Sequence, residues 1–204
     1  MKSIIVLCGG LSTRMGQDKG SMNYDDEPMI IHVIKTVKKV ADEVILVLRD
    51  ENQCQVYKKI LDENQLLNMD GLKICTDIVK DQGPLEGILT GLKQINSINA
   101  MVIPCDSPFI SNSFLTKVFD ISYMHKGYDA YVPILANGKL EPLHSIYSKN
   151  SINLIEKLID NDIRSVRALI SHLKVKYIDI EKLDISGKSF INLNSYEDIS
   201  NIQK

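Results

Sequence analysis

Short apolar runs alternate with amphipathic segments through the first half of the chain. The segments between the runs place apolar side chains on one face of a helix. This order predicts parallel strands joined by right-handed crossovers, with helices on both faces of the sheet. We therefore expect a three-layer α/β fold with a mostly parallel central sheet. The expected strands are Ser3–Cys8, Glu43–Leu48, Leu72–Cys75 and Ala100–Cys105, and the expected helices are Pro28–Val40, Asn52–Leu67 and Pro84–Ile95.

The second half of the chain is less regular. Asn137-Gly138 is a strong turn signal between two alternating segments, Tyr128–Leu135 and Leu140–Tyr147, which predicts a hairpin or two strands joined by a tight turn. Ser195 and Asp198 form a capping box for a last helix that ends near Gln203. Further expected elements are helices at Ser151–Ile159 and Ser165–Leu173, a strand at Lys174–Ile180 and a short strand at Phe190–Leu193. No linker or repeat interrupts the chain, so we expect one domain over residues 1–204.

Charge and cysteine content narrow the class of protein. The 204 residues carry a net charge of -2, which disfavours binding to nucleic acid or to a membrane surface through the whole surface. No apolar stretch approaches the length of a membrane span, and the N-terminus lacks a signal-peptide pattern. None of the four cysteines forms a C-x-x-C motif, so we expect buried free thiols, as suits a cytoplasmic protein.

A glycine-rich, cationic loop follows the first strand, in the segment Leu7–Gly20. Gly9 and Gly10 allow backbone N–H groups to approach an anion closely, and Arg14 and Lys19 add positive charge. The segment is neither a Walker A motif nor a G-x-G-x-x-G dinucleotide motif. It therefore predicts a cradle for a polyphosphate of a different kind.

Two carboxylates follow other strands of the same expected sheet. Asp106 ends the fourth strand, where it could hold Mg²⁺ or cap the turn before Pro108. Asp77 ends the third strand, where it could meet a ligand or be an ordinary loop carboxylate. Ligands of parallel sheets bind beyond the carboxyl ends of the strands, so both positions favour a site, without deciding the role of either residue.

Two further groups of polar side chains lie in the second half. Arg164 and Arg167 are three residues apart, so on a helix they would share a face that either binds an anion or is solvated. Asn192 and Asn194 alternate with apolar residues and could contact a ligand, or Asn194 could start a helix.

Four segments, in order over nearly the whole chain, resemble the signature of nucleotidyltransferases with a Rossmann-like fold, and most of all the molybdenum cofactor guanylyltransferases. The first is Leu7-x-Gly9-Gly10-x-Ser12-x-Arg14-Met15-Gly16-x-Asp18-Lys19, which many nucleotidyltransferases share. The others are more specific as a set: Gly83-Pro84-Leu85-Glu86-Gly87, Pro104-Cys105-Asp106-Ser107-Pro108 and Asn192-Leu193-Asn194-Ser195-Tyr196-Glu197-Asp198.

This resemblance implies a Rossmann-like nucleotidyltransferase fold, with a nucleotide-binding half at residues 1–110 and an acceptor-binding half at residues 111–204. It implies transfer of GMP from GTP to the terminal phosphate of Mo-molybdopterin, with Mg²⁺ as cofactor and molybdoenzyme maturation proteins as further candidate partners. The implied catalytic residues are Arg14, Lys19 and Asp106, the last also the metal ligand. The implied nucleotide-binding residues are Leu7, Cys8, Gly9, Gly10, Lys19, Asp77 and Asp106, and the implied acceptor-binding residues are Arg164, Asn192 and Asn194.

The chain departs from the family at one position. The family commonly carries an Asn near the end of the second strand that helps to bind the nucleotide, and here Arg49 or Asn52 would have to replace it. Two alternatives therefore stay open. One is another nucleotidyltransferase of the same fold, either a cytidylyltransferase that acts on the pterin cofactor or a sugar-phosphate nucleotidyltransferase. The other is a non-catalytic nucleotide- or cofactor-binding assembly protein.

Overall fold

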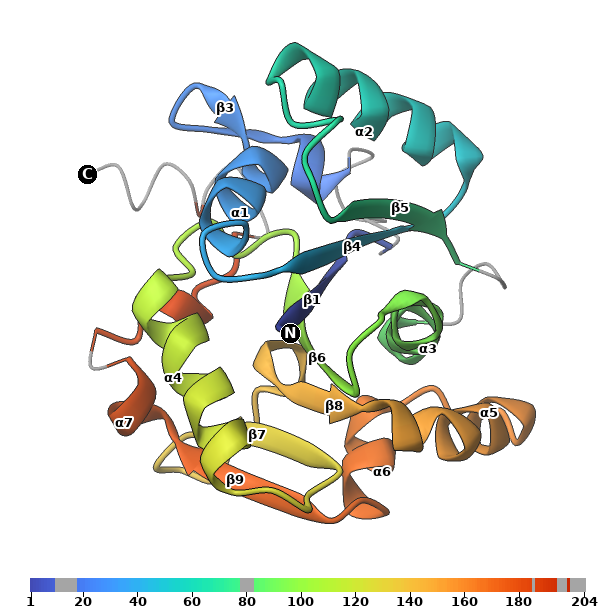
Figure 1. Cartoon of the computed structure of the whole chain (residues 1–204), viewed down its shortest axis with the longest axis vertical. Coiled ribbons are helices and arrows are strands. Elements are labelled where there is room, and N and C mark those ends of the chain that lie inside the picture. Colours follow the sequence, from blue (N-terminus) through green and yellow to red (C-terminus); the bar gives the residue numbers. More distant parts are fainter. Residues whose placement is uncertain (10–17, 78–82, 185, 194–197, 199–204) are drawn as a thin grey trace.

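The computed structural model describes the chain except for residues 10–17, 78–82, 185, 194–197 and 199–204. Within the described residues, seven strands form one sheet in the order β5-β4-β1-β6-β8-β7-β9, crossed by helices on both faces (Figure 1). Its strands are β1 (Ser3–Leu7), β4 (Glu43–Leu48), β5 (Leu72–Thr76), β6 (Asn99–Pro104), β7 (Ala130–Ile134), β8 (Ile146–Ser148) and β9 (Val175–Asp179). A separate two-stranded ribbon joins β2 (Asn23–Tyr24) to β3 (Glu27–Pro28).

The sheet is mostly parallel, as the sequence predicted. β1 pairs in parallel with both β4 and β6, and β4 pairs in parallel with β5. β8 is antiparallel to both of its neighbours, β6 and β7, whereas β7 and β9 are again parallel. All four strands predicted in the first half are therefore present and adjacent in space.

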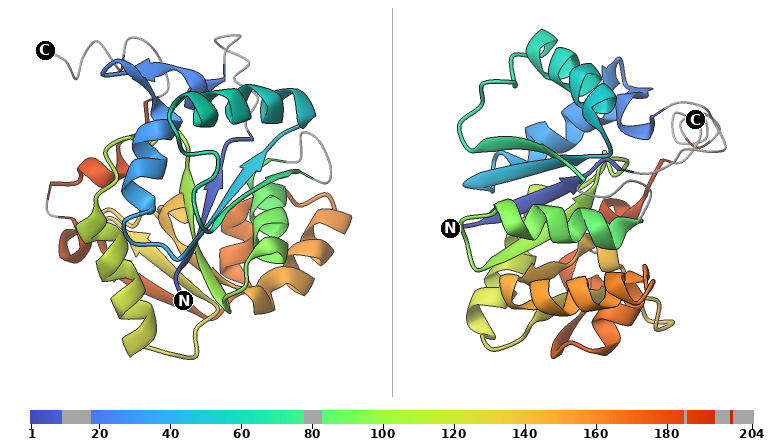
Figure 2. Two further views of the ribbon diagram at one scale, coloured as in Figure 1. Left: turned by 45° about the horizontal axis from the view of Figure 1, so that its top comes forward. Right: turned by 90° about the vertical axis from the view of Figure 1, so that its right-hand side faces the viewer.

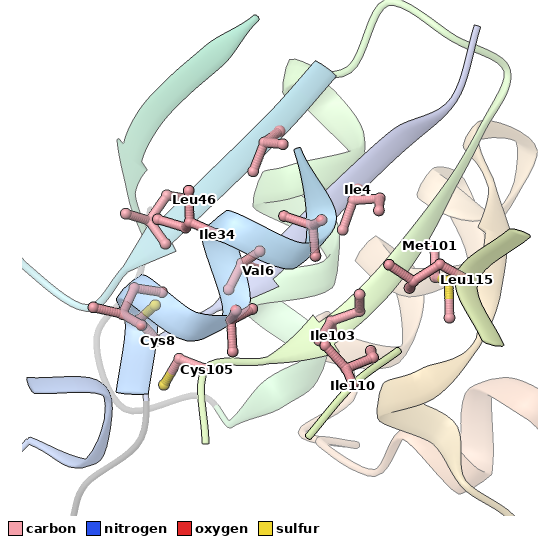
Figure 3. Close-up of a cluster of buried hydrophobic side chains, with 14 of the residues drawn as sticks. Ile4, Val6, Cys8, Ile34, Leu46, Met101, Ile103, Cys105, Ile110 and Leu115 are labelled. Atoms are coloured by element: carbon pink, nitrogen blue, oxygen red, sulfur yellow. The ribbon is translucent and has the colours of Figure 1, made fainter. Parts of the chain in front are cut away.

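Alternation of side chains along the strands explains the three layers. Ile4 and Val6 of β1 point to one face, and Ile5 and Leu7 point to the other. The first face is covered by α1 (Met29–Val37), α2 (Glu51–Glu63), α4 (Asn112–Met124) and α7 (Ile180–Leu183), and part of its core is drawn in Figure 3. The second face is covered by α3 (Pro84–Gln94), α5 (Ile152–Asp160) and α6 (Val166–Ser171), with α3 and α5 side by side in Figure 2.

Turns set the ends of two predicted helices. The first helix was expected to reach Val40 but ends at Val37. The second was expected to reach Leu67 but ends at Glu63, because Gln65 takes a left-handed φ of 56° that no α-helix accommodates.

The predicted hairpin of the second half is present in modified form. The Gly138 N–H donates to the Leu135 carbonyl at 2.8 Å, and Ile134 bridges Leu140, so the turn lies where the sequence placed it. The return segment is not one continuous strand, because Pro142 opens a 3-10 helix, Pro142–His144, before β8 begins. Lys19–Ser21, Lys149–Ser151 and Lys188–Phe190 are further 3-10 helices.

Two expectations for the second half were wrong or incomplete. The strand predicted at Phe190–Leu193 does not form: Gly187, with φ 67°, starts a 3-10 turn, and no ladder partner lies beside residues 191–193 in the described part of the chain. Helix α4 was not predicted, although Ser111 caps it by accepting from the Phe114 N–H at 3.1 Å. The predicted last helix lies outside the described residues apart from Asp198.

Candidate active site

The strand order of the sheet reverses direction between β1 and β6, whose carboxyl ends lie side by side. β4 and β5 follow on one side of β1, whereas β6 lies on its other side. Ligands of open α/β sheets bind in the crevice at such a reversal. The Cys105 N–H donates to the Leu7 carbonyl at 3.0 Å, so Cys8 and Cys105 lie next to one another where the two strands end (Figure 3).

Lys19 and Asp106 meet at this edge, as the sequence predicted. Lys19 Nζ lies 3.2 Å from Asp106 Oδ2, although the two residues are 87 positions apart in the chain. Lys19 is the first residue of the 3-10 helix Lys19–Ser21, and Asp106 lies two residues after the end of β6. The glycine-rich segment and the fourth strand therefore deliver opposite charges to one place.

The second oxygen of Asp106 is the unusual feature of the pair. Asp106 is only 8% exposed, and its Oδ1 has no hydrogen-bond partner among the described residues. Burial raises the pKa of Asp106 above its ordinary value, although Lys19 opposes the shift. A buried, unpartnered carboxylate oxygen beside a cation is the kind of donor that an oxygen-seeking divalent cation would complete.

Asp77 lies against the start of the glycine-rich segment. A Cβ added to Gly9 would lie 2.9 Å from Asp77 Oδ2, so only glycine allows this approach without a shift of Asp77. Burial, followed by the charge of Glu86, raises the pKa of Asp77 to about 7. Glu86 lies in the first turn of α3, whose N-cap Gly83 has a φ of 76°. Asp77, Gly9 and the N-terminal end of α3 are thus neighbours.

Three side chains that the sequence analysis did not assign hold the segment next to Lys19. The Asp18 carboxylate accepts from the Gly20 N–H at 3.0 Å, from the Tyr57 hydroxyl and from Gln53 Nε2. Gln53 Nε2 also donates to the Cys8 carbonyl at 2.9 Å, and its Oε1 accepts from the Arg49 N–H at 2.6 Å. An amide and a phenol one turn apart on the buried face of a helix are the sequence signal that could have identified them.

Asn192 reaches the same edge from the C-terminal segment. The Ser107 hydroxyl donates to Asn192 Oδ1 at 2.6 Å, and the Leu193 N–H donates to the Asp106 carbonyl at 2.9 Å. Ser107 also lies 3.1 Å from His144 Nε2, and burial lowers the pKa of His144 to about 3. His144 is therefore a neutral ring in the structural support of Asn192.

Arg164 lies near the site, but its guanidinium bonds to residues close to it in the sequence. Its guanidinium donates to the Ile159 carbonyl at 2.7 Å and to Asp162 at 3.0 Å, which caps the end of α5. Its own carbonyl lies 4.0 Å from the position of a Cβ on Gly83, so its backbone is close to the start of α3. Arg164 precedes α6, so the helical face expected to unite it with Arg167 does not form. An acceptor-binding role for Arg164 stays a prediction.

The remaining predicted site residues divide into two groups. Leu7 and Cys8 are buried at the end of β1, where the Leu7 carbonyl accepts from the Cys105 N–H and the Cys8 N–H donates to the Val47 carbonyl. Their nucleotide-binding role stays a prediction. Of the two proposed substitutes for the family Asn, Arg49 Nε pairs with Asp50 at 3.1 Å and Asn52 is exposed on α2. The predicted residues that lie outside the described part of the chain are Gly10, Arg14 and Asn194.

The cysteines are free thiols, as expected: Cys8, Cys54 and Cys105 are buried, and Cys75 is partly buried. Within the described ranges, no group of three or more His, Cys, Asp and Glu side chains is arranged to hold a metal ion. None of the described helices is both long and apolar enough to cross a membrane.

Comparisons with known proteins agree with this geometry. A family described as the MobA-like NTP transferase domain matches residues 4–176. A probable molybdenum cofactor guanylyltransferase of Methanothermobacter thermautotrophicus is 36% identical over 200 residues, covering 98% of each chain. One of Methanosarcina mazei with the same name is 32% identical over 206 residues, covering 98% of this chain and 89% of that protein.

Solved structures show the same fold. The crystal structure of molybdopterin-guanine dinucleotide biosynthesis protein A from Archaeoglobus fulgidus superposes with a TM-score of 0.82 at 24% identity, covering 98% of this chain and 95% of that one. A 4-diphosphocytidyl-2C-methyl-D-erythritol synthase from Anaerococcus prevotii superposes with a TM-score of 0.71 at 16% identity, covering 100% and 99%. With a family match over most of the chain and full-length relatives above 30% identity, the chain belongs to the MobA-like NTP transferase family.

Proposed function

We propose that this protein transfers GMP from GTP to the terminal phosphate of Mo-molybdopterin, releasing pyrophosphate. The observation that carries the proposal is the Lys19–Asp106 pair at the reversal point of the sheet. Relatives that span the whole chain carry the name of this activity. We propose a cytoplasmic location for the protein.

The chemistry needs charge neutralisation and alignment rather than a general base. An oxygen of the acceptor phosphate is already anionic, and it forms a bond to the α-phosphorus of GTP. The bond from that phosphorus to the bridging oxygen breaks, and the electron pair leaves with pyrophosphate. The neutral, buried His144 is accordingly not needed as a base.

The described residues fit these demands. The Lys19 ammonium would bind the triphosphate, and the backbone at Gly9 would approach it closely. Asp77 would contact the nucleotide from the neighbouring strand. Arg14 and Gly10 are proposed to complete the cradle, with Arg14 beside the departing pyrophosphate.

Asp106 is proposed to hold Mg²⁺. Its Oδ1 is buried without a partner among the described residues, and carboxylate oxygen is the ligand type that Mg²⁺ prefers. When bound, the ion would neutralise charge on the phosphate oxygens. Mg²⁺ commonly takes only one or two protein carboxylates, with phosphates and water completing its shell, so a larger acidic cluster is not required.

The acceptor would approach from the C-terminal side of the same edge. Asn192 lies there, fixed through Ser107, and Arg164 and Asn194 are proposed to join it. Docking of molybdoenzyme maturation proteins belongs to the same proposal, since the product must reach an apo-enzyme.

Product mass tests the function directly. Wild-type protein is incubated with Mo-molybdopterin, Mg²⁺ and each of GTP, CTP, ATP and UTP, and the pterin product is weighed by mass spectrometry. We expect the pterin to gain the mass of one GMP when GTP is supplied, with one pyrophosphate released for each GMP transferred. A product only with CTP would assign the protein to the cytidylyltransferases. Tight binding without pyrophosphate release would identify an assembly protein instead.

A further inference from the structure

Two buried polar side chains on α2 converge on one carboxylate at the rim of the site. Gln53 is 5% exposed and Tyr57 is fully buried, and they lie one helical turn apart among apolar neighbours. Both reach Asp18, with Tyr57 donating to Oδ1 and Gln53 donating to Oδ2. Polar groups on the buried face of a helix are costly unless every one is bonded, which makes this convergence informative.

The contacts tie three parts of the site together. Gln53 bonds the Cys8 carbonyl at the end of β1 and the Arg49 N–H at the end of β4, in addition to Asp18. Asp18 in turn caps the 3-10 helix in which Lys19 is the first residue. A Cβ on Gly20 would lie 2.2 Å from the Tyr57 oxygen and 3.1 Å from Cys105 Sγ, so this short helix packs closely on the phenol and on the residue that follows β6.

Asp18 is thereby distinguished from Asp106. Both oxygens of Asp18 accept hydrogen bonds from protein donors, whereas Asp106 has one oxygen without a partner in the described part of the chain. The Asp18 carboxylate therefore acts as a structural acceptor through both oxygens, whereas Asp106 keeps one oxygen that can bind a ligand.

We propose that Gln53 and Tyr57 are positioning residues for Lys19: by clamping the Asp18 carboxylate, they hold the neighbouring ammonium opposite Asp106, where it receives the triphosphate. This inference rests on the proposed function and names the residues that preorganise its phosphate contact. Without the clamp, the segment from Asp18 to Ser21 loses its attachment to α2, and binding of a triphosphate must order it first.

Tyr57→Phe is the sharpest test, because it removes one hydroxyl and leaves the ring. A hydrogen bond to a charged group contributes more than one between neutral groups, so we expect GTP affinity in the presence of Mg²⁺ to fall about tenfold by calorimetry. Gln53→Met is the second variant and should act in the same direction while filling the same space.

Tyr131→Phe is the matched control. Tyr131 is also buried, and its hydroxyl donates to the Ser122 and His125 carbonyls at the C-terminal end of α4. It should lose comparable thermal stability and bind GTP as wild type does. Equal GTP affinity in Tyr57→Phe and Tyr131→Phe would overturn the positioning role.

A double-mutant cycle with Lys19→Ala separates positioning from a general structural effect. If Tyr57 acts through Lys19, adding Tyr57→Phe to Lys19→Ala should cause no further loss of GTP affinity. The same tenfold loss in both backgrounds would contradict the proposal. The readout is binding of GTP, so absence of GMP transfer to the pterin would overturn the proposed function while leaving this cycle interpretable, and a wild type that binds no GTP would overturn both.

Discussion

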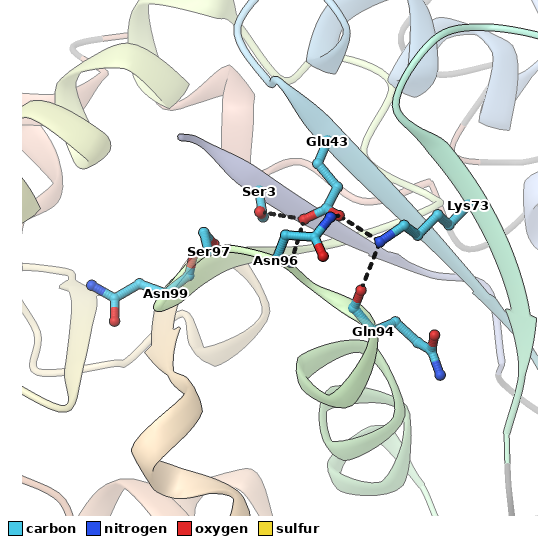
Figure 4. A network of polar contacts seen from close by, with 7 residues as sticks. All are labelled: Ser3, Glu43, Lys73, Gln94, Asn96, Ser97 and Asn99. Atoms are coloured by element: carbon cyan, nitrogen blue, oxygen red, sulfur yellow. Dashed lines mark hydrogen bonds and ion pairs between the residues drawn. The ribbon is translucent and has the colours of Figure 1, made fainter.

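Two buried carboxylates lie at opposite edges of the same sheet, and their surroundings are opposite in kind. Glu43, at the start of β4, is 2% exposed and accepts from Lys73, from Ser3 and twice from Asn96, at 2.7–2.9 Å (Figure 4). Asp106, after β6, has one charged partner and one oxygen without a partner among the described residues. Both oxygens of Glu43 accept hydrogen bonds from protein donors, whereas Asp106 has one oxygen available for a ligand.

The pKa values express the same difference. Burial alone would raise the pKa of Glu43, but its donors outweigh burial and lower it from the ordinary value. Burial raises the pKa values of Asp106 and Asp77, and there the donors do not compensate. The edge at the amino ends of the parallel strands, which holds Glu43, is the amino edge, and its contacts favour stability. The edge at their carboxyl ends, which holds Asp77 and Asp106, is the carboxyl edge, and its buried carboxylates retain unfavourable electrostatics that a ligand can relieve.

The largest effect should follow Asp106→Asn. We expect GMP transfer to fall about a thousandfold, equivalent to about 4 kcal/mol of transition-state stabilisation, because the amide cannot replace the carboxylate as a metal ligand. Thermal unfolding should be unchanged or move to higher temperature, because a buried charge is removed and Lys19 can reach water. If Asp106→Asn lost stability as well as activity, Asp106 would stabilise the fold as Glu43 does, and the proposed difference between the two edges would be wrong.

Glu43→Gln should show the reverse pattern. The amide nitrogen of Gln would replace one carboxylate oxygen and would face a hydrogen-bond donor, Ser3, Lys73 or Asn96, with which it cannot bond as an acceptor. We therefore expect a loss of about 2–3 kcal/mol in the free energy of unfolding. Because the folded-state pKa of Glu43 is lowered, its contribution is present above the unfolded value near 4.5 and is lost as pH falls through the folded value. Urea unfolding at pH 7 and at pH 3 measures this, with GMP transfer expected at the wild-type rate. Selective loss of activity would show that the amino edge also serves the reaction.

Asp77→Asn tests the carboxyl edge through pH. The pKa of Asp77 is raised to about 7, so the folded state binds its proton more tightly, and ionisation destabilises the protein as pH rises from about 4 to 7. Water screens the partly exposed carboxyl, so we expect the variant to gain only about 1 kcal/mol, or about 2–4 °C in Tm, at pH 8. At pH 4.5 the two proteins should unfold together. An equal gain at both pH values would mean that the charge of Asp77 is not the cause.

Lys73→Met should have the smallest effect. Glu43 keeps its bonds from Ser3 and Asn96, and Lys73 is half-exposed, so we expect a loss of about 0.5 kcal/mol with activity unchanged. Differential scanning calorimetry of Lys73→Met and Glu43→Gln under the same conditions compares their losses of stability. A loss as large as that of Glu43→Gln would show that the ion pair, rather than the whole set of donors, stabilises this edge.

The sequence predicted the parallel half of the fold because its strands are continuous apolar runs and its helices have a clear period. The same alternation placed Lys19 and Asp106 at one edge, since parallel strands end together. The strand at Phe190–Leu193 was wrong because a four-residue apolar alternation does not reveal whether a partner strand exists. The roles of Gln53 and Tyr57 were missed because a periodic pattern classes such positions as core: their polar groups one turn apart could have marked them as a pair, but only the tertiary structure shows that Asp18 is their partner.

The position of a divalent ion tests the central claim most directly. Crystals of wild-type protein with GTP and Mn²⁺, a heavier stand-in for Mg²⁺, can be measured at the manganese absorption edge. The account predicts an anomalous peak in contact with Asp106 Oδ1 and with phosphate oxygens, with Lys19 Nζ bonded to the triphosphate. A peak remote from Asp106, or a triphosphate bound away from the carboxyl ends of β1 and β6, would contradict it.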